Sequence, residues 1–285
     1  GEALMHTLPV LLRNGAPLPD LRQKYWTLTE NGINLDRTIL ASAPRQQALL
    51  SLLARDRRID ARSLVKQFSY SIIRKLSDRE FIRLEHEEEA KPNSEKILKT
   101  KPMKLSREQK LVMNQMVLDR FNVWLLDGVT GSGKTEIYLQ CIEQVLSIGK
   151  QVLVLIPEIS LTPQTEGRFR DRFNVPIAII HSGITNKHRL ESWAMARSSF
   201  VKIVLGTRSA IFTPLQEPGL IVVDEEQDLS YKQQDGFRYS ARDIAVMRAQ
   251  RADIPIILGS ATPSLESIQN CKNSRYQQLF MSDRA

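Results

Sequence analysis

Residues 128–135 read Gly-Val-Thr-Gly-Ser-Gly-Lys-Thr and follow the apolar run 123–126, Val-Trp-Leu-Leu. The glycines let backbone N–H groups close around phosphate oxygens, and a helix starting at the loop's end directs its positive end at the same anion. Lys134 would reach the β and γ phosphates, and the Thr135 hydroxyl would bind Mg²⁺. A glycine-rich turn without a ligand is the alternative, and the flanking strand and helix patterns disfavour it. The predicted ATP-binding residues of this loop are Gly128, Thr130, Gly131, Ser132, Gly133, Lys134 and Thr135.

Short apolar runs rich in β-branched residues alternate with segments of helix length over residues 105–285. The runs are 123–126, 152–156, 177–180, 201–205, 220–223 and 256–258. Runs without polar alternation are typical of strands buried on both faces, which indicates a parallel sheet covered by helices. We therefore predict an α/β nucleotide-binding domain over residues 105–285.

Two further strand ends carry polar residues suited to nucleotide chemistry. Asp224-Glu225-Glu226-Gln227 follows the apolar run 220–223. Since ligands bind at the carboxyl ends of parallel strands, Asp224 would complete the Mg²⁺ site and Glu225 would orient and deprotonate the attacking water. Residues 259–263, Gly-Ser-Ala-Thr-Pro, end the next run, and their hydroxyls would bond the acidic cluster and sense the γ phosphate. The candidate catalytic residues are Lys134, Asp224, Glu225 and Gln227, and Ser260 and Thr262 join the nucleotide site.

The front of the chain reads as a smaller, basic module. Residues 1–104 carry 19 Lys and Arg against 13 Asp and Glu, within an overall net charge of +8. Helix patterns starting near residues 44, 60 and 70, followed by a strand near 81–84, are the order of a winged helix, whose third helix often enters a DNA groove. We predict a linker segment over 1–43, a winged-helix domain over 44–88 and a solvated linker over 89–104. A protein-binding module or a spacer remains the alternative.

Composition narrows the class of protein. No stretch approaches the roughly 20 apolar residues that span a bilayer, and no leader opens the chain. The two cysteines, Cys141 and Cys271, have no paired spacing, so neither a disulfide framework nor a metal cluster is indicated. We expect a cytoplasmic, nucleoid-associated protein without a membrane partner.

Taken together, the phosphate loop, the acidic box and residues 259–263 resemble the first motor lobe of superfamily 2 helicases, a RecA-like P-loop lobe. The resemblance narrows to the PriA-type primosomal helicases, which restart stalled bacterial replication forks. It rests on these stretches, in order: Gly-Val-Thr-Gly-Ser-Gly-Lys-Thr-Glu at 128–136, Pro-Glu-Ile-Ser-Leu-Thr-Pro-Gln at 157–164, His-Ser-Gly at 181–183, Gly-Thr-Arg-Ser-Ala at 206–210 and Tyr-Lys-Gln-Gln at 231–234.

The resemblance implies further site residues. Gln109 would read adenine, and the segments 157–164 and 206–210 would follow a single-strand backbone. An aromatic-rich loop over 231–242 would stack bases on its rings and hold phosphates with its cations. The predicted DNA-binding residues are Thr162, Gln164, Thr207, Arg208, Tyr231, Lys232, Phe237, Arg238, Tyr239 and Arg242. The alternatives are that Pro157 only ends a strand, that Arg208 forms a local salt bridge, and that the loop over 231–242 is a buried aromatic corner.

The implied function is an ATP-dependent 3′ to 5′ DNA helicase of replication restart. Its cofactors would be ATP and Mg²⁺, and its partners single-stranded and forked DNA, primosome proteins and single-stranded DNA-binding protein. Gln227 departs from the family's usual histidine, and it can both donate and accept hydrogen bonds. The resemblance also implies an N-terminal domain that binds DNA 3′ ends, and residues 1–43 are expected to be the linker leading out of it. The second lobe, its arginine finger and the zinc-binding cysteines are expected beyond Ala285, so this chain should bind ATP but hydrolyse it poorly alone. A truncated, non-catalytic DNA- or primosome-binding module and a restriction-type translocase lobe are the alternatives.

Overall fold

The computed structural model describes residues 5, 7–87 and 96–284. It contains two compact units: a smaller one over Asp20–Ala90, and a larger one formed by Gly1–Pro19 together with Lys91–Ala285. Parts of the predicted linkers, residues 1–4, 6 and 89–95, lie outside the described residues, as does residue 285. None of the described helices is long and apolar enough to cross a membrane.

The larger unit is built on a seven-stranded sheet in the order β12-β4-β11-β8-β5-β7-β6. Every neighbouring pair is parallel, which confirms the predicted α/β class. Six strands coincide with the predicted runs, whereas the edge strand β12, which begins with two glutamines, was not predicted. The strands are β4 (Val123–Gly128), β5 (Gln151–Leu155), β6 (Ile177–Ile180), β7 (Ile203–Gly206), β8 (Pro218–Val223), β11 (Ile256–Ser260) and β12 (Gln277–Met281).

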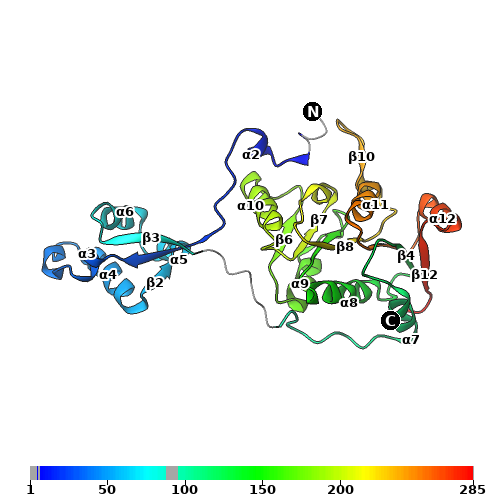
Figure 1. The fold of residues 1–285 in the computed structure, drawn as a ribbon, viewed down its shortest axis with the longest axis horizontal. Coiled ribbons are helices and arrows are strands. Elements are labelled where there is room, and N and C mark those ends of the chain that lie inside the picture. Colours follow the sequence, from blue (N-terminus) through cyan, green and yellow to red (C-terminus); the bar gives the residue numbers. More distant parts are fainter. Residues whose placement is uncertain (1–4, 6, 88–95, 285) are drawn as a thin grey trace. The chain divides into compact units, whose positions relative to one another are not determined.

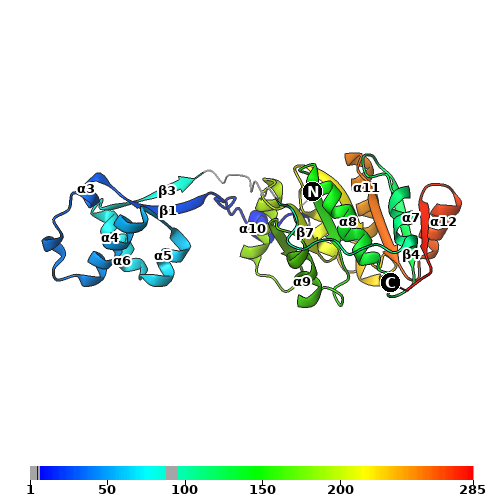
Figure 2. The ribbon, with the colours of Figure 1, turned by 90° about the horizontal axis from the view of Figure 1, so that it is seen from below.

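Helices cover both faces of this sheet. One core cluster joins the sheet to α7 (Arg107–Gln115), α8 (Lys134–Ser147) and α9 (Pro163–Arg172). The second cluster, on the opposite face, includes α10 (Asn186–Arg197) and α11 (Ala241–Ala252). Figure 1 shows α8 and α9 on one side of the strands and α10 and α11 on the other, and Figure 2 shows these layers from below. The remaining elements are α2 (Val10–Arg13), η2 (Arg208–Phe212), η3 (Leu229–Tyr231), β9 (Lys232–Gln233), β10 (Tyr239–Ser240) and α12 (Leu265–Lys272).

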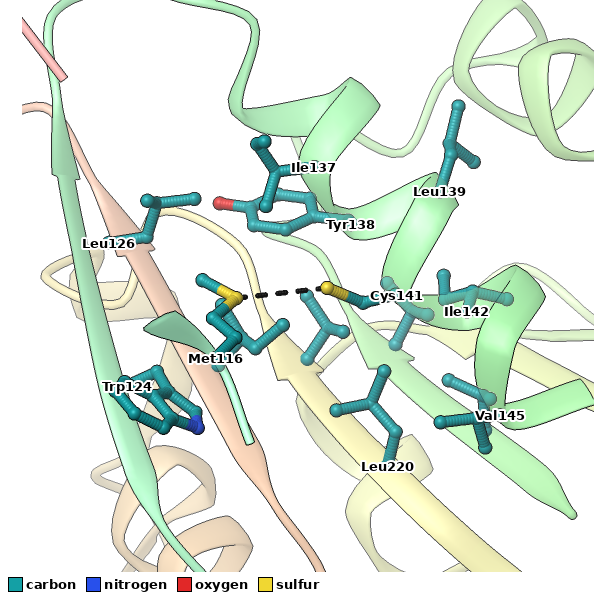
Figure 3. Packing of buried hydrophobic residues seen from close by; sticks show 14 of the residues in the cluster. Met116, Trp124, Leu126, Ile137, Tyr138, Leu139, Cys141, Ile142, Val145 and Leu220 are labelled. Atoms are coloured by element: carbon teal, nitrogen blue, oxygen red, sulfur yellow. Dashed lines mark hydrogen bonds between the residues drawn. The ribbon is translucent and has the colours of Figure 1, made fainter. Parts of the chain in front are cut away.

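The core under α8 is closely packed around Cys141 (Figure 3). The Cys141 thiol lies 3.7 Å from the sulfur of Met116, and Trp124 and Leu126 of β4 face the same cluster. Burial raises the pKa of Cys141 to about 12, so the thiol stays protonated and packs as a small apolar group. Each fully buried aliphatic side chain contributes about 1.5–3 kcal/mol, and this packing fixes α8 directly behind the phosphate loop.

The smaller unit is a three-stranded antiparallel sheet, in the order β2-β1-β3, with helices packed on it. The predicted helices and strand are confirmed as α4, α5, α6 and β3. The central strand β1 lies within the segment that was predicted to be a linker. It was missed because it pairs with β3, which is distant in sequence, with Trp26 opposite Leu84. The elements are β1 (Gln23–Leu28), α3 (Glu30–Ile33), η1 (Arg37–Leu40), α4 (Pro44–Asp56), β2 (Arg58–Asp60), α5 (Ala61–Gln67), α6 (Tyr70–Asp78) and β3 (Ile82–Glu87).

Candidate active site

The phosphate loop connects β4 to α8 in a backbone conformation that requires glycine. Gly131 and Gly133 have φ values of 83° and 84°, and Gly133 is the residue directly before α8. A Cβ added at Gly128 would lie 2.7 Å from the Ser132 hydroxyl oxygen. The loop therefore holds a tight curl at the N-terminus of an α-helix, where an anion is stabilised.

Two polar side chains of the phosphate loop are suited to bind an anionic ligand. The Lys134 ammonium is buried and donates to the Gly128 carbonyl at 2.7 Å. The Ser132 hydroxyl is buried and has no hydrogen-bond partner among the described residues. A phosphate oxygen is the kind of acceptor that satisfies both groups, so the loop fits the phosphates of a nucleotide.

A cleft of about 650 Å³ opens over this loop. Six of the predicted nucleotide residues line it, namely Thr130, Gly131, Ser132, Gly133, Lys134 and Thr135, together with Asp224 and Glu225. Lys101, Arg168 and Arg172 line it as well, and sequence reasoning missed them. No motif marks these three cations, because they reach the cleft only through the packing of α9 and the segment before α7.

The start of α8 is fixed by a buried ion pair between Glu136 and Arg172. Glu136 also accepts hydrogen bonds from the Met103 backbone at 3.2 Å and from Gln140 at 2.8 Å. One carboxylate thus joins the phosphate-loop helix to α9 and to the segment at residue 103. Thr135 and Glu136 both line the cleft, and Glu136 also supports the start of α8.

Asp224 follows β8 and lines the cleft beside Thr135. Its carboxylate accepts a hydrogen bond from the Tyr138 hydroxyl at 3.1 Å. Burial, followed by the neighbouring charge of Glu225, raises the pKa of Asp224. A divalent cation would relieve both effects, and Mg²⁺ favours a carboxylate and a hydroxyl in combination with substrate phosphates, so Asp224 and Thr135 fit that ion.

Tyr138 is placed for this contact by the neighbouring strand β11. Its hydroxyl lies where a side chain at Gly259 would project, so only glycine fits there. Burial and the charge of Asp224 raise the pKa of Tyr138 well above its ordinary value, which keeps the phenol protonated as a donor. Glycine is therefore required at position 259 because Tyr138 packs against it, and the turn-like sequence of residues 259–263 did not indicate this.

Glu225 lies at the mouth of the cleft in a left-handed backbone conformation, φ 46°, which is rare outside glycine and concentrates at functional sites. The Gln227 amide donates to its carboxylate at 2.9 Å. The Ser260 hydroxyl donates to the Gln227 carbonyl at 2.6 Å, and the Thr262 backbone N–H donates to the Ser260 hydroxyl at 2.9 Å. This relay connects β11 to Glu225, and Gln227 uses both ends of its amide.

Three residues predicted to contact the nucleotide make supporting contacts within the site. Ser260 is fully buried, and its hydroxyl is committed to Gln227, so it acts in the relay rather than on a phosphate. Thr262 enters the relay through its backbone and does not line the cleft. Gln109 is 4% exposed, and its side-chain amide accepts from the Ser106 N–H at 2.9 Å and donates to the Ser132 carbonyl at 3.0 Å, so it supports the phosphate loop, and its contact with adenine stays a prediction.

Arg242 was predicted to bind DNA, and the structure corrects this. Arg242 is 8% exposed, and its guanidinium donates to the Glu226 carboxylate at 3.0 Å. Glu226 is 2% exposed and also accepts from the Ser264 N–H at 2.7 Å and the Ser267 hydroxyl at 2.9 Å. A buried charge survives only with such partners, so the pair is a structural tie between the acidic box, α11 and α12. Sequence reasoning missed this role of Glu226.

Tyr231 is a second correction within the aromatic-rich loop. Its side chain is 1% exposed, and its hydroxyl donates to the Asp224 carbonyl at 2.7 Å. A ring enclosed in this way has no face on which a base can stack. For Tyr231 the buried-corner alternative is therefore the right one, because the turn after the acidic box folds back on β8.

The other predicted DNA residues lie mainly at the surface around the carboxyl ends of β5 and β7. Thr162, Gln164, Lys232 and Arg238 are exposed, whereas Phe237, Tyr239 and Arg208 are half-buried. Arg208 donates to the carbonyls of Ser230 and Lys232, each at 3.1 Å, so it also pins the aromatic-rich loop. Thr207 is 3% exposed, yet it borders a cleft of about 370 Å³ with Arg208.

The sequence that forms the larger unit matches a known family. The DEAD/DEAH box helicase family matches residues 106–271. The chain belongs to this family. It is 46% identical to replication restart protein PriA of Haemophilus influenzae, over 100% of this chain and 40% of that protein. It is 40% identical to replication restart protein PriA of Bacillus subtilis, over 85% of this chain and 31% of that protein.

These relatives confirm the resemblance to PriA-type proteins that the motifs predicted. The chain spans less than half the length of each of them. Among solved structures, the Hef helicase domain of Pyrococcus furiosus matches with a TM-score of 0.47 and 23% identity, over 62% of this chain and 37% of that one.

Proposed function

We propose that the larger unit is the nucleotide-binding motor lobe of an ATP-dependent 3′ to 5′ DNA helicase that acts in replication restart. The observation that carries the proposal is the joint lining of one cleft by the phosphate loop, Asp224 and Glu225. Membership of the DEAD/DEAH box helicases and the similarity to replication restart proteins support the reaction class. Forked and single-stranded DNA, primosome proteins and single-stranded DNA-binding protein are the partners that this function requires.

In the proposed reaction the protein positions the nucleotide and the attacking water and forms no covalent bond with them. Lys134 leaves the Gly128 carbonyl for the β and γ phosphates, and the loop N–H groups and Ser132 hold their oxygens. Mg²⁺, held by Thr135 and Asp224, would neutralise phosphate charge. Glu225 orients the attacking water and takes its proton, while Gln227 keeps that carboxylate aimed.

The proposed DNA path crosses the carboxyl ends of β5 and β7. Support comes from the exposed polar residues there, Thr162, Gln164, Lys232 and Arg238, and from the cleft beside Arg208. Nearly all affinity for a single strand comes from such phosphate contacts and from stacking on rings. DNA at this edge lies next to the acidic box, since β5 and β8 are paired.

The smaller unit is proposed to be a winged-helix domain that contacts duplex DNA. Its order of elements, α4, β2, α5, α6 and β3, supports the proposal, with β1 as the additional strand. The third helix, α6, exposes Tyr70, Arg74 and Lys75, side chains suited to a DNA backbone.

ATP hydrolysis with and without single-stranded DNA tests the proposed function. The full-length protein should hydrolyse ATP faster with DNA, and Glu225→Gln should abolish the increase while leaving ATP bound. We predict slow turnover for the 285-residue chain alone. A full-length protein that binds neither ATP nor DNA contradicts the proposal.

A further inference from the structure

A second cavity, of about 230 Å³, lies on the larger unit apart from the nucleotide cleft. Its aromatic wall comes from Trp193 of α10, Phe212 of η2, and Phe237 and Tyr239 of the aromatic-rich loop, and residues 7–9 and Ile180 of β6 also line it. The Phe212 and Tyr239 rings meet edge to face with centroids 4.9 Å apart, and Phe237 lies 5.9 Å from Tyr239 at 30°. Four aromatic side chains thus line one cavity together.

The cavity also has polar groups in its wall, contributed by Ser209, Gln233 and Asp235. Flat rings with a few hydrogen-bonding groups suit a ligand with apolar faces and a polar rim, which describes a nucleobase.

The neighbouring cleft supplies the charge that the rest of a nucleotide needs. This cleft, of about 370 Å³, is lined by three arginines, Arg13, Arg189 and Arg208, and by one acid, Glu158, and it shares Arg189 and Tyr239 with the aromatic cavity. Arg208 interacts directly with the Tyr239 hydroxyl. The guanidinium of Arg189 donates to the His181 carbonyl at 2.6 Å and to the Ser209 hydroxyl at 3.2 Å, which fixes it between the two hollows.

We infer that the cavity bounded by Trp193, Phe212 and Tyr239 receives one unstacked base of a single DNA strand whose phosphates lie in the adjoining arginine-lined cleft. This inference rests on the proposed function and adds to it a base-binding pocket. Trp193 and Phe212 lie outside every predicted DNA segment, and only the fold brings them to the aromatic-rich loop. Since every base has a flat face, the pocket binds without strong sequence preference.

The test compares two fluorescein-labelled strands of twelve nucleotides, oligo-thymidine and a fully abasic strand with the same phosphates, by anisotropy with the 285-residue chain. Stacking of one base contributes about 1–3 kcal/mol, so oligo-thymidine should bind about 5- to 150-fold more tightly. Trp193→Ala should reduce this ratio to about 2 or less, because only base binding is lost. Phe237→Leu, at a half-buried loop position, serves as the second variant should Trp193→Ala fail to fold.

Two controls separate this pocket from DNA binding in general. Arg238→Ala, at an exposed cation, should weaken both strands by the same factor and keep their ratio. Phe280→Ala, a 62% exposed ring on β12, should change neither. Equal affinity of the wild-type chain for both strands, or a ratio that survives both pocket variants, overturns the inference and leaves the DNA-binding proposal standing. Binding of neither strand overturns both.

Discussion

Replacing Arg242 with methionine distinguishes a structural role from a DNA-binding role at that position. The substitution removes the cation from a carboxylate, Glu226, that is 2% exposed. Loss of one partner of a buried ion pair costs about 3–5 kcal/mol, because the other charge stays buried. For a unit of this size, 1 kcal/mol lowers Tm by about 2–4 °C, so we expect a decrease of roughly 10 °C.

Thermal unfolding followed by circular dichroism measures this decrease, with anisotropy of labelled oligo-thymidine as the second readout. Arg238→Met is the matched control, since Arg238 lies in the same loop but is exposed. That control should lose DNA affinity and keep its Tm within about 2 °C. Adding Glu226→Gln to Arg242→Met should restore most of the loss, because the unpaired charge is gone. An Arg242→Met protein that keeps its Tm and loses DNA affinity refutes the structural assignment.

Three further predictions follow from individual contacts. Gln227→Ala breaks the relay to Glu225, so DNA-stimulated ATP hydrolysis by the full-length protein should fall about 10-fold or more, with little change in ATP affinity. Thr262→Ala keeps the backbone donor of the relay, so its rate in the same steady-state assay should stay near that of the wild type. Cys141, whose pKa burial raises to about 12, should resist alkylation in the native chain and react only on unfolding, as read by mass spectrometry. Hydrogen bonds from the Ser282 and Asp283 backbones lower the pKa of Glu108 below its ordinary 4.5. The stabilising contribution of Glu108 is therefore present above pH 4.5 and is lost as the pH falls through the lowered pKa. Amide exchange of residues 282 and 283 should show this loss of protection, and Glu108→Gln should remove the pH dependence.

The sequence predicted the parts of the fold that depend on local patterns. Buried parallel strands are continuous apolar runs, so six of the seven strands of the large sheet were found. The seventh, β12, begins with Gln277 and Gln278, and its pairing with β4 cannot be read from so polar an edge. Strand β1 escaped prediction for a related reason, since its partner strand β3 lies far along the chain.

Within the candidate site, residue type predicted location better than role. The phosphate loop and the acids Asp224 and Glu225 lie together in the cleft, as their places after strands implied. Roles that depend on burial could not be predicted, because the same tyrosine or arginine serves DNA at a surface and packing in a core. Arg242 and Arg238 are the same residue type in the same aromatic-rich loop, yet Arg242 is buried and Arg238 is exposed.

The proposed function requires that the cleft over the phosphate loop binds ATP. Isothermal titration calorimetry of the 285-residue chain with ATP and Mg²⁺ tests it most directly, with Lys134→Ala as the variant. We predict one site per chain and at least about 10-fold weaker binding by Lys134→Ala, since a charged hydrogen bond to phosphate contributes about 1.5–3 kcal/mol. No heat of binding in the wild-type chain, or equal affinity in the variant, would contradict ATP binding at this cleft.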